Sequence, residues 1–307
     1  MKPAVVLADQ RATMEESVSA FLDHITQQRE LSANTRAAYQ NDLSQLTKFL
    51  RAKGVDTWRI DRARVGAFAQ DLLDRGYSAS TRARKVAAVR SFYRYLCEQG
   101  IVAEDPTKEL GSTHVERMVP TVLTHAQVRA LFAAAEEKSS PEALRDLSIL
   151  QLLYSTGLRI TEALGIDLGD VVRESQHVVL RTRNKQSAVP IDDACVAAIE
   201  RYLTESRPQL QTSRSGEALF LNHRGQRLTR QGFWLILKGY ARAARLPEVT
   251  PQTLRHTFAA HALEESVPLQ RVRSMLGHTS MSTTQRYAQL AEARSAAEPE
   301  NDENAQD

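Results

Sequence analysis

The sequence predicts a mainly α-helical protein with a small β-sheet, divided into a helical first domain and a mixed α+β second domain. Apolar residues recur at helical spacing through most of the chain, whereas residues 176–191 place β-branched runs on either side of a polar basic turn. A length of 307 residues is long for one core of the usual size. The expected segments are a first domain at 12–104, a linker at 105–120, a second domain at 121–291 and a tail at 292–307.

Helices account for the expected first domain. One helix is predicted in residues 32–54 and another in residues 78–100, with Gly54 and Gly100 as their C-terminal stops and Ser80 as the cap of the second. The apolar stripes of the two helices are Tyr39, Leu43, Leu46 and Leu50, and Val86, Val89, Tyr93 and Leu96.

The second of these helices also carries a basic face. Four cations recur on it at helical spacing: Arg82, Lys85, Arg90 and Arg94. A helix that lies along a DNA backbone needs such a stripe to neutralise phosphates. A soluble amphipathic helix explains the same stripe without any ligand.

The second domain is predicted to open with two helices, continue through a hairpin and end in further helices. The first two are a capped helix at 123–137 and one at 144–157 that ends at Gly157. The hairpin has Arg181, Arg183 and Lys185 near its tip. Helices follow at 193–206 and 229–244, the latter with Trp234 as an expected core residue.

Composition is that of a soluble globular protein. Hydrophobic residues make up 42% of the chain and charged residues 25%, and no apolar run approaches the roughly 20 residues of a membrane helix. The start of the chain lacks a secretory signal, so we expect a cytoplasmic protein with no membrane partner. Cys97 and Cys195 lie in separate halves without metal-ligand spacing, which favours buried thiols over a disulfide or a zinc site.

The net charge of +3 is unevenly distributed. Residues 292–307 hold six acidic side chains and one arginine, a net charge of −5, so residues 1–291 carry +8. A basic body suits a polyanion such as nucleic acid, although a solvated basic surface gives the same count. The acidic end of the tail has no apolar face, and we expect it to be disordered.

Three short stretches of the second domain contain residues that suit phosphate chemistry. In "STGLRITEAL", Arg159 enters a helix with Glu162 three residues later. In "TPQTLRHTFAAHAL", a helix capped by Thr250 carries Arg255 in its early turns. In "LGHTSMSTTQRYAQL", Gly277 ends a helix, His278 follows, and Ser282 with Gln285 is a capping box for the helix of Tyr287. Taken singly, each residue has an ordinary explanation as a surface charge, a loop histidine or a packing tyrosine.

Together the three stretches resemble, in order and spacing, the active-site boxes of the tyrosine recombinase (phage integrase) family, and most closely the bacterial Xer recombinases. Residues 32–50 and 80–96 resemble the family's helical, SAM-like core-binding domain, so the likeness covers roughly residues 14–290. It implies an enzyme that cuts and rejoins double-stranded DNA at specific sites through a 3′-phosphotyrosyl link. It also implies a tetramer on two DNA sites, made of one recombinase or of two Xer-type recombinases.

The resemblance assigns Tyr287 as the nucleophile and Arg159, Arg255 and His278 as ligands of the scissile phosphate. The chemistry supports this assignment, because an arginine fork donates two parallel hydrogen bonds to phosphate and keeps its charge. A phenol with a pKa of about 10 needs a cationic pocket to become reactive. Fixed donors replace a metal in this scheme, so neither a metal nor another cofactor is expected.

Two positions depart from the family pattern. Aligned on its "NK" and "VP" pairs, the stretch "RTRNKQSAVP" puts Thr182 where the family has the lysine that protonates the leaving 5′ oxygen. Threonine cannot act as a cationic acid, so Lys185 is the candidate replacement; Arg181 and Arg183 can supply charge but are poor proton donors.

The other departure is Gln252, which stands where the family commonly has histidine. Its amide can bond a phosphate oxygen but cannot transfer a proton. His256 and His261 are expected to be structural, since His256 points about 100° away from its neighbour Arg255 around the helix.

Two other functions remain open from the sequence. Thr182 and Gln252 permit a DNA-binding regulator or accessory subunit with weakened cleavage, and the same boxes suit a type IB-like topoisomerase. The target sequence, any partner recombinase and the setting (chromosome dimer resolution at cell division, plasmid or mobile element) are not specified by the residues.

Overall fold

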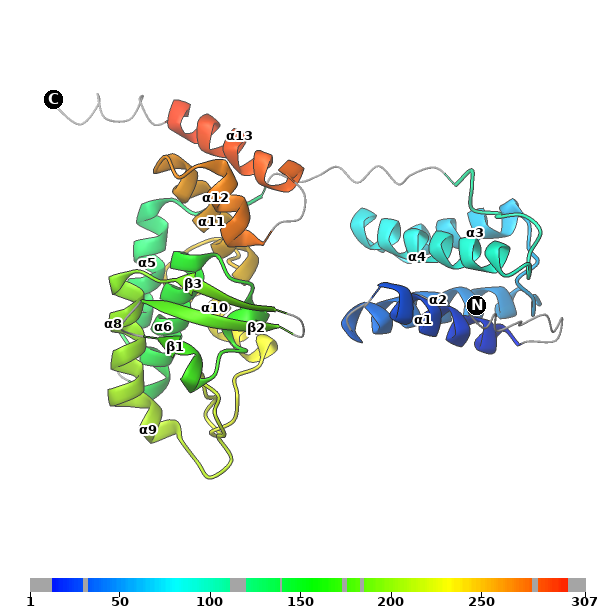
Figure 1. The fold of residues 1–307 in the computed structure, drawn as a ribbon. Helices are drawn as coiled ribbons and strands as arrows, with labels where there is room; N and C mark the ends of the chain where they lie inside the picture. The colour runs from blue at the N-terminus through cyan, green and yellow to red at the C-terminus, as the bar shows by residue number, and fades with distance from the viewer. Residues whose placement is uncertain are drawn as a thin grey trace. The chain divides into compact units, whose positions relative to one another are not determined.

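The chain divides into two compact units, Met1–Met118 and Val119–Asp307 (Figure 1). Both are built mainly from helices, and the second contains a three-stranded antiparallel sheet, which confirms the predicted fold class. None of the helices in the described part of the chain has both the length and the apolar character of a membrane span. The computed structural model describes residues 13–29, 33–110, 120–138, 140–172, 176–182, 185–277 and 281–297.

The first unit packs its helices around an aromatic core. Its helices are α1 (Met14–Arg29), α2 (Ala33–Ala52), α3 (Arg62–Asp74) and α4 (Ala79–Glu98). Phe92 meets Phe21 and Trp58 edge to face, with ring centroids 5.3 and 4.8 Å away. The predicted apolar stripes of α2 and α4 are confirmed, since Leu43 and Leu96, among others, are fully buried.

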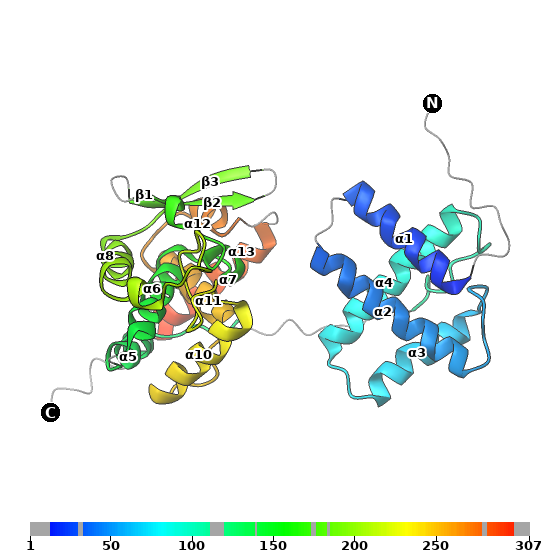
Figure 2. The ribbon, with the colours of Figure 1, turned by 90° about the horizontal axis from the view of Figure 1, so that it is seen from below.

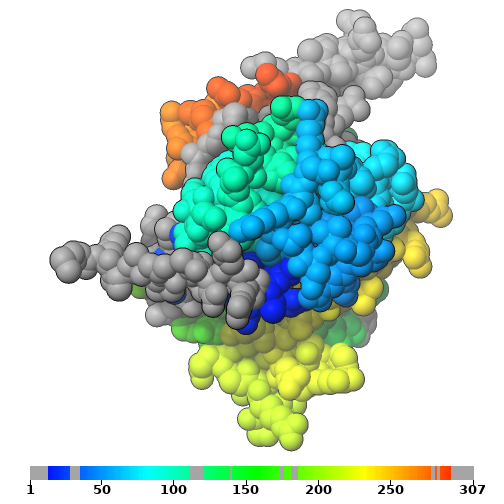
Figure 3. All heavy atoms as spheres, turned by 90° about the vertical axis from the view of Figure 1, so that its right-hand side faces the viewer, coloured from blue at the N-terminus to red at the C-terminus, as the bar shows by residue number. Residues whose placement is uncertain are grey.

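Two details at the edges of these helices were not foreseen. The N-cap of α4 is Ser78, whose hydroxyl accepts the Thr81 N–H at 3.3 Å, so the expectation of a cap at Ser80 is wrong. Packing also continues beyond residue 104, because Thr107 is buried and Leu110 contacts the core. Figure 3 shows the described surface of the first unit in blue to cyan. Residues 105–110 therefore pack on the first unit.

The second unit contains the remaining elements. In chain order they are α5 (His125–Glu136), α6 (Pro141–Thr156), α7 (Ile160–Ala163), η1 (Leu168–Asp170), β1 (Val171–Val172), β2 (His177–Thr182), β3 (Lys185–Pro190), α8 (Asp193–Arg201), η2 (Tyr202–Ser206), α9 (Arg207–Leu210), α10 (Arg230–Ala243), α11 (Pro251–Glu264), α12 (Leu269–Leu276) and α13 (Met281–Ala297). Helix α6 is the central element, because α5, α8 and α11 all pack against it. Leu150 and Leu153 of α6 are consequently fully buried.

The sheet lies along one edge of the second unit (Figure 2). Strands β2 and β3 form the predicted hairpin, in register from His177 opposite Pro190 to Thr182 opposite Lys185. Strand β1 pairs with the other side of β2 and was not predicted. It has two residues, too few for an alternating pattern to appear in the sequence.

Trp234 is not a core residue, contrary to the prediction. Helix α10 buries Phe233, Leu237 and Tyr240, which recur at intervals of four and three. Trp234 lies about 100° from Phe233 around the helix, so its side chain is 37% exposed, with the Lys238 amino group 5.1 Å from its ring centroid.

Candidate active site

Arg255 connects the ends of three separate helices. Helix α11 begins at the predicted cap, where the Thr250 hydroxyl accepts the Thr253 N–H at 3.1 Å, and this start places Arg255 in the second turn. The guanidinium is buried; its Nη1 donates to the carbonyl oxygen of Gly157 at 2.6 Å, and its Nη2 donates to that of Leu276. These carbonyls lie where α6 and α12 end. The three sequence boxes are therefore brought together by one side chain.

The Gly157 turn requires a glycine. Its φ of +63° lies in the left-handed region, and a Cβ placed on it would lie 2.3 Å from Cδ1 of Phe258 and 2.9 Å from Cδ2 of Leu276. Both neighbours belong to a small core that also contains Tyr287. The close approach of α6 to α11 and α12 thus depends on the missing side chain.

We expect Gly157→Ala to lower the free energy of unfolding by about 1–3 kcal/mol, because the new methyl group overpacks this contact and the left-handed turn is strained. Urea unfolding followed by circular dichroism measures the change. Gly239→Ala in α10 is the matched control, since a Cβ there meets nothing within 4 Å. Equal unfolding midpoints for the two variants would contradict the packing argument.

Arg159 is oriented by Glu162. Arg159 is the N-cap residue of α7, and its Nη1 lies 2.9 Å from Oε1 of Glu162, while its backbone N–H donates to Oε2 at 2.8 Å. A Cβ placed on Gly277 would lie 4.0 Å from the same Nη1, so the end of α12 is adjacent to this arginine. Unlike Arg255, Arg159 has an exposed side chain, of which 50% is accessible. Glu162 therefore fixes the orientation of the Arg159 side chain, which remains accessible to a ligand.

A cavity of about 390 Å³ lies in front of the two arginines. Gln252, in the first turn of α11, lines it together with Arg230 and Trp234 of α10. Three guanidinium groups and the N-terminal end of α11 therefore border one hollow, an arrangement that attracts an anion such as phosphate. Arg230 and Trp234 were not assigned to the site from sequence, because their part of the chain shows only the apolar period of α10.

Tyr287 lies in α13 and is only 4% exposed, packed in the small core with Phe258 and Leu276. Burial raises the pKa of its phenol, and the charges of Arg255 and Arg286 oppose that rise. The phenol is therefore protonated at neutral pH in the isolated chain and lies within the field of two cations. Arg286 was not singled out from sequence, although its place beside Tyr287 is visible there.

His256 contacts two residues of this group, although it points about 100° away from Arg255 around the helix. Its ring centroid lies 5.5 Å from that of Tyr287, and its Nε2 lies 2.7 Å from the amide nitrogen of Gln252. Burial, followed by the charges of Arg255 and Arg286, lowers the pKa of His256. The pKa of Arg255 is also lowered, first by burial and then by the charge of Arg159.

Several predicted site residues fall outside the described part of the structure. They are His278 and Arg183 as a whole, and the side chains of Arg181, Thr182 and Lys185. The backbones of Thr182 and Lys185 pair directly at the last rung of the hairpin. Helix α13 already begins at Met281, so Ser282 lies inside its first turn and the predicted capping box is wrong.

The basic face of α4 differs from the predicted stripe at Lys85. This residue is 2% exposed, and its amino group lies 2.8 Å from Oδ1 of Asp42 in α2. Lys85 is therefore buried in an ion pair and is not an exposed phosphate ligand. Arg82 donates to the carbonyl oxygen of Tyr77 at 2.6 Å, and Arg94 is exposed.

Arg90 is partly buried and donates to the carbonyl oxygen of Leu110, so it holds residues 105–110 against the first unit. The assignment of Arg82, Arg90 and Arg94 to DNA binding stays a prediction.

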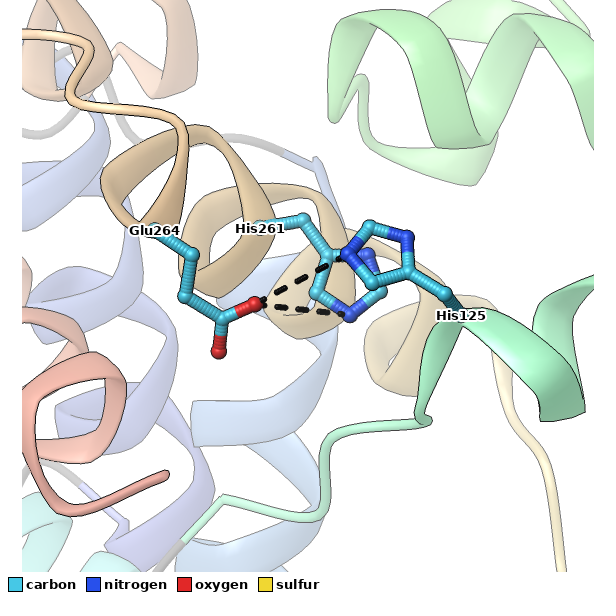
Figure 4. A group of neighbouring side chains, drawn as sticks. All are labelled: His125, His261 and Glu264. Carbon is cyan, nitrogen blue, oxygen red and sulfur yellow. Dashed lines mark ion pairs between the residues drawn. The ribbon is translucent and has the colours of Figure 1, made fainter. Parts of the chain in front are cut away.

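His125, His261 and Glu264 lie together, and each offers an atom of a type that can bind a metal ion (Figure 4). The two imidazole rings stack with centroids 3.8 Å apart, and Glu264 faces both. However, Nε2 of His261 lies 2.9 Å from the carbonyl oxygen of Leu123, and its Nδ1 lies 2.9 Å from the Tyr154 hydroxyl. A metal ion would have to displace one of these two hydrogen bonds of the buried His261 ring. We therefore interpret the group as structural, with His261 linking Leu123 to α11.

Two family profiles match the chain. The profile of the Phage integrase family matches residues 121–294, and that of the phage integrase N-terminal SAM-like domain matches residues 18–100. Tyrosine recombinase XerC of Roseiflexus castenholzii is 46% identical over 281 residues, which cover 90% of each chain. Tyrosine recombinase XerD of Pseudomonas aeruginosa is 37% identical over 279 residues, which cover 90% of this chain and 93% of that protein.

Solved structures share the fold. The XerH site-specific recombinase bound to a palindromic difH substrate, a post-cleavage complex, superposes with a TM-score of 0.74 at 19% identity, covering 91% of this chain and 84% of that one. A lambda integrase dimer bound to a COC′ core site superposes with a TM-score of 0.70 at 15% identity, covering 90% and 95%.

Proposed function

Because the chain belongs to the phage integrase family of tyrosine recombinases, we propose that it cuts and rejoins DNA through a covalent bond between Tyr287 and a 3′ phosphate. The family profile covers most of the second unit, and the XerC and XerD relatives align along nine tenths of the chain. The protein is thus a tyrosine-type site-specific recombinase similar to XerC and XerD, as the resemblance predicted.

One observation carries the proposal: Arg159, Arg255 and Tyr287 meet in one small region of the second unit. Arg159 and Tyr287 both act electrostatically on the buried guanidinium of Arg255. The three residues come from different helices, and two backbone carbonyl oxygens at the ends of α6 and α12 hold the guanidinium of Arg255 in place. A phosphate in the adjoining cavity would have two guanidinium donors and a nearby phenol.

In the proposed reaction the phenol oxygen of Tyr287 attacks phosphorus and the 5′ oxygen leaves. Arg159 and Arg255 donate to the non-bridging oxygens, where negative charge develops, and Gln252 adds an amide donor. The guanidinium of Arg255 is fixed before substrate binds, so it does not have to reorganise during the reaction. By resemblance, His278 donates to the same phosphate.

Lys185 is our candidate for the acid that protonates the leaving oxygen. Directly paired positions on antiparallel strands share a face of the sheet, and Lys185 pairs with Thr182, the position of the family lysine. The pairing of the two backbone positions supports Lys185 as the replacement for the family lysine.

We expect the Lys185→Ala substitution to slow cleavage of ordinary DNA about 10²- to 10⁴-fold. The variant protein should cleave a 5′-phosphorothiolate substrate at nearly the wild-type rate. A thiolate leaving group needs no proton, so it bypasses the missing acid. Single-turnover rates of adduct formation on the two substrates give the comparison. Gln186→Ala, one residue along the same strand, is the control and should leave both rates unchanged. Slow cleavage of both substrates by Lys185→Ala would remove the lysine from this role.

The proposed assembly is a tetramer that brings two DNA sites together. The subunits are either four copies of this chain or pairs with a second Xer-type recombinase. The first unit would bind the duplex through residues such as Arg82 and Arg94, and the second unit would bind the DNA around the scissile phosphate. Because basic side chains release counterions from DNA, binding should weaken steeply with salt.

A nicked suicide substrate tests the function. The nick lets a short fragment diffuse away after cleavage, so a covalent protein–DNA adduct accumulates and is visible on a denaturing gel. An adduct supports the recombinase and topoisomerase functions. If the protein binds a cognate site and forms no adduct, the alternative function of a DNA-binding regulator or accessory subunit is favoured. Strand exchange between two labelled sites then separates a recombinase from a type IB-like topoisomerase, which relaxes DNA without exchange.

A further inference from the structure

His256 lies between two residues of the site. It follows Gln252 by one helical turn on α11, so the two side chains share a face, and their polar atoms lie 2.7 Å apart. On its other side the imidazole contacts the Tyr287 ring of α13, with the planes tilted by 59°.

The proposed reaction requires a proton acceptor for the nucleophile. The phenol of Tyr287 is protonated, because burial raises its pKa, and an attacking phenol has to lose that proton. The amide of Gln252 cannot accept it, and a guanidinium is already fully protonated. A neutral imidazole is the group best suited to this transfer near neutral pH.

We propose that His256 is the acid–base partner of Tyr287: its imidazole takes the phenol proton as the phenol oxygen attacks phosphorus, and returns the proton when the DNA is rejoined. The proposal rests on the proposed function of Tyr287 as the nucleophile. It transfers to residue 256 a task that Gln252 cannot perform.

The step balances as follows in atoms and charge. The phenol oxygen forms the bond to phosphorus with its own electron pair while its proton moves to a ring nitrogen of His256. The bond between phosphorus and the 5′ oxygen breaks, and the leaving oxygen takes a separate proton from the acid assigned to Lys185. Rejoining reverses every transfer, so the imidazolium of His256 protonates the departing phenol oxygen.

Gln252 sets which ring nitrogen is available. An amide can present either its N–H or its oxygen to a ring nitrogen, and the two orientations differ by a half-turn of the amide. With the amide oxygen toward the ring, Nε2 of His256 donates to Gln252 and Nδ1 keeps its lone pair for the phenol proton. The same orientation turns the two amide N–H groups of Gln252 away from His256, where a phosphate oxygen can accept them.

The charges around His256 keep it neutral. Arg255 on its own helix and Arg286 on α13 both lower its pKa, after burial has done so to a larger extent. Tyr287 also faces the ring of His256, and its phenol is uncharged at neutral pH. The imidazole is therefore neutral above its lowered pKa, and it is lost as a base only when the pH falls through that value.

The pH dependence of single-turnover adduct formation tests the proposal between about pH 5 and 9. For the wild-type protein we expect a rate that is flat near neutral pH and falls as His256 becomes protonated, at a pKa below the ordinary 6.5. For His256→Gln we expect a rate about 10²- to 10⁴-fold lower that loses this acidic limb and rises with pH as the phenol ionises. Glutamine keeps a hydrogen-bonding partner for Gln252, and His256→Asn provides a second variant if the first fails to unfold cooperatively.

Two further measurements distinguish a proton acceptor from a packing residue. A 5′-phosphorothiolate should leave His256→Gln slow, because that substrate replaces only the leaving-group acid. Introducing Gln252→His into the His256→Gln protein should recover part of the rate and restore an acidic limb. His223→Gln, at an exposed histidine outside the site, is the control and should keep the wild-type profile.

An unchanged profile in His256→Gln, or full rescue by the phosphorothiolate, would overturn the proposal. These failures differ from a failure of the proposed function, in which the wild-type protein itself forms no adduct on DNA that it binds.

Discussion

Replacing Tyr287 with phenylalanine is expected to abolish the covalent protein–DNA adduct completely while leaving the fold and DNA binding intact. The substitution removes one oxygen atom, the proposed nucleophile, and keeps the ring that packs against Phe258 and Leu276. Without that oxygen no phosphotyrosyl bond can form. Denaturing gels with a labelled suicide substrate measure the adduct, and a mobility shift measures binding.

Tyr154→Phe is the matched control for this prediction. Tyr154 is also a partly buried tyrosine of the second unit, and its hydroxyl lies 2.9 Å from Nδ1 of His261, in the group that fastens Leu123 to α11. We expect that variant to lose some stability and to retain the adduct. An adduct in Tyr287→Phe would show that another residue is the nucleophile, because nothing else at position 287 can form the bond.

Arg255→Lys is expected to lower the cleavage rate about 10²- to 10³-fold and to destabilise the protein by about 1–3 kcal/mol. The rate falls because an ammonium group cannot offer the planar fork that bonds two phosphate oxygens. Stability falls because the shorter donor set leaves the carbonyl of Gly157 or of Leu276 without its present partner. Adduct kinetics and urea unfolding measure the two effects.

Arg159→Lys separates catalysis from stability. Arg159 is half exposed, and its guanidinium bonds Glu162 near the protein surface, so its replacement should slow cleavage to a similar extent while the unfolding midpoint changes little. If Arg255→Lys and Arg159→Lys were equally destabilised, the bonds of Arg255 to the helix ends would not contribute the stability that we assign to them. If neither slowed cleavage, the phosphate clamp would lie elsewhere.

Most of the helices could be predicted from local patterns. The stripes of α2 and α4, the Thr250 cap of α11 and the left-handed glycines at 157 and 277 all depend on residues within one or two turns of each other. The errors at Ser80 and Ser282 are shifts of a helix start by one or two residues. Such boundaries depend on several competing caps, so a single capping residue does not determine them.

Trp234 and Lys85 show where local patterns fail. A tryptophan among apolar residues was expected inside, and a lysine on a basic face was expected outside. Which side of α10 is covered depends on elements elsewhere in the chain, and Lys85 is buried because Asp42 on α2 faces it. Asp42 is 43 residues away from Lys85 in the sequence, so no local periodicity could indicate this ion pair.

The order and spacing of three sequence boxes were enough to identify the family and to select Arg159, Arg255 and Tyr287. Those features are local and chemically specific, so each box can be identified from a few contiguous residues without knowledge of the fold. Only the tertiary structure decided that Arg255 is anchored on the ends of α6 and α12, and that His256 contacts Tyr287. Contacts of this kind join residues far apart in the chain, and their distances are set by the packing of whole helices, which no single segment encodes.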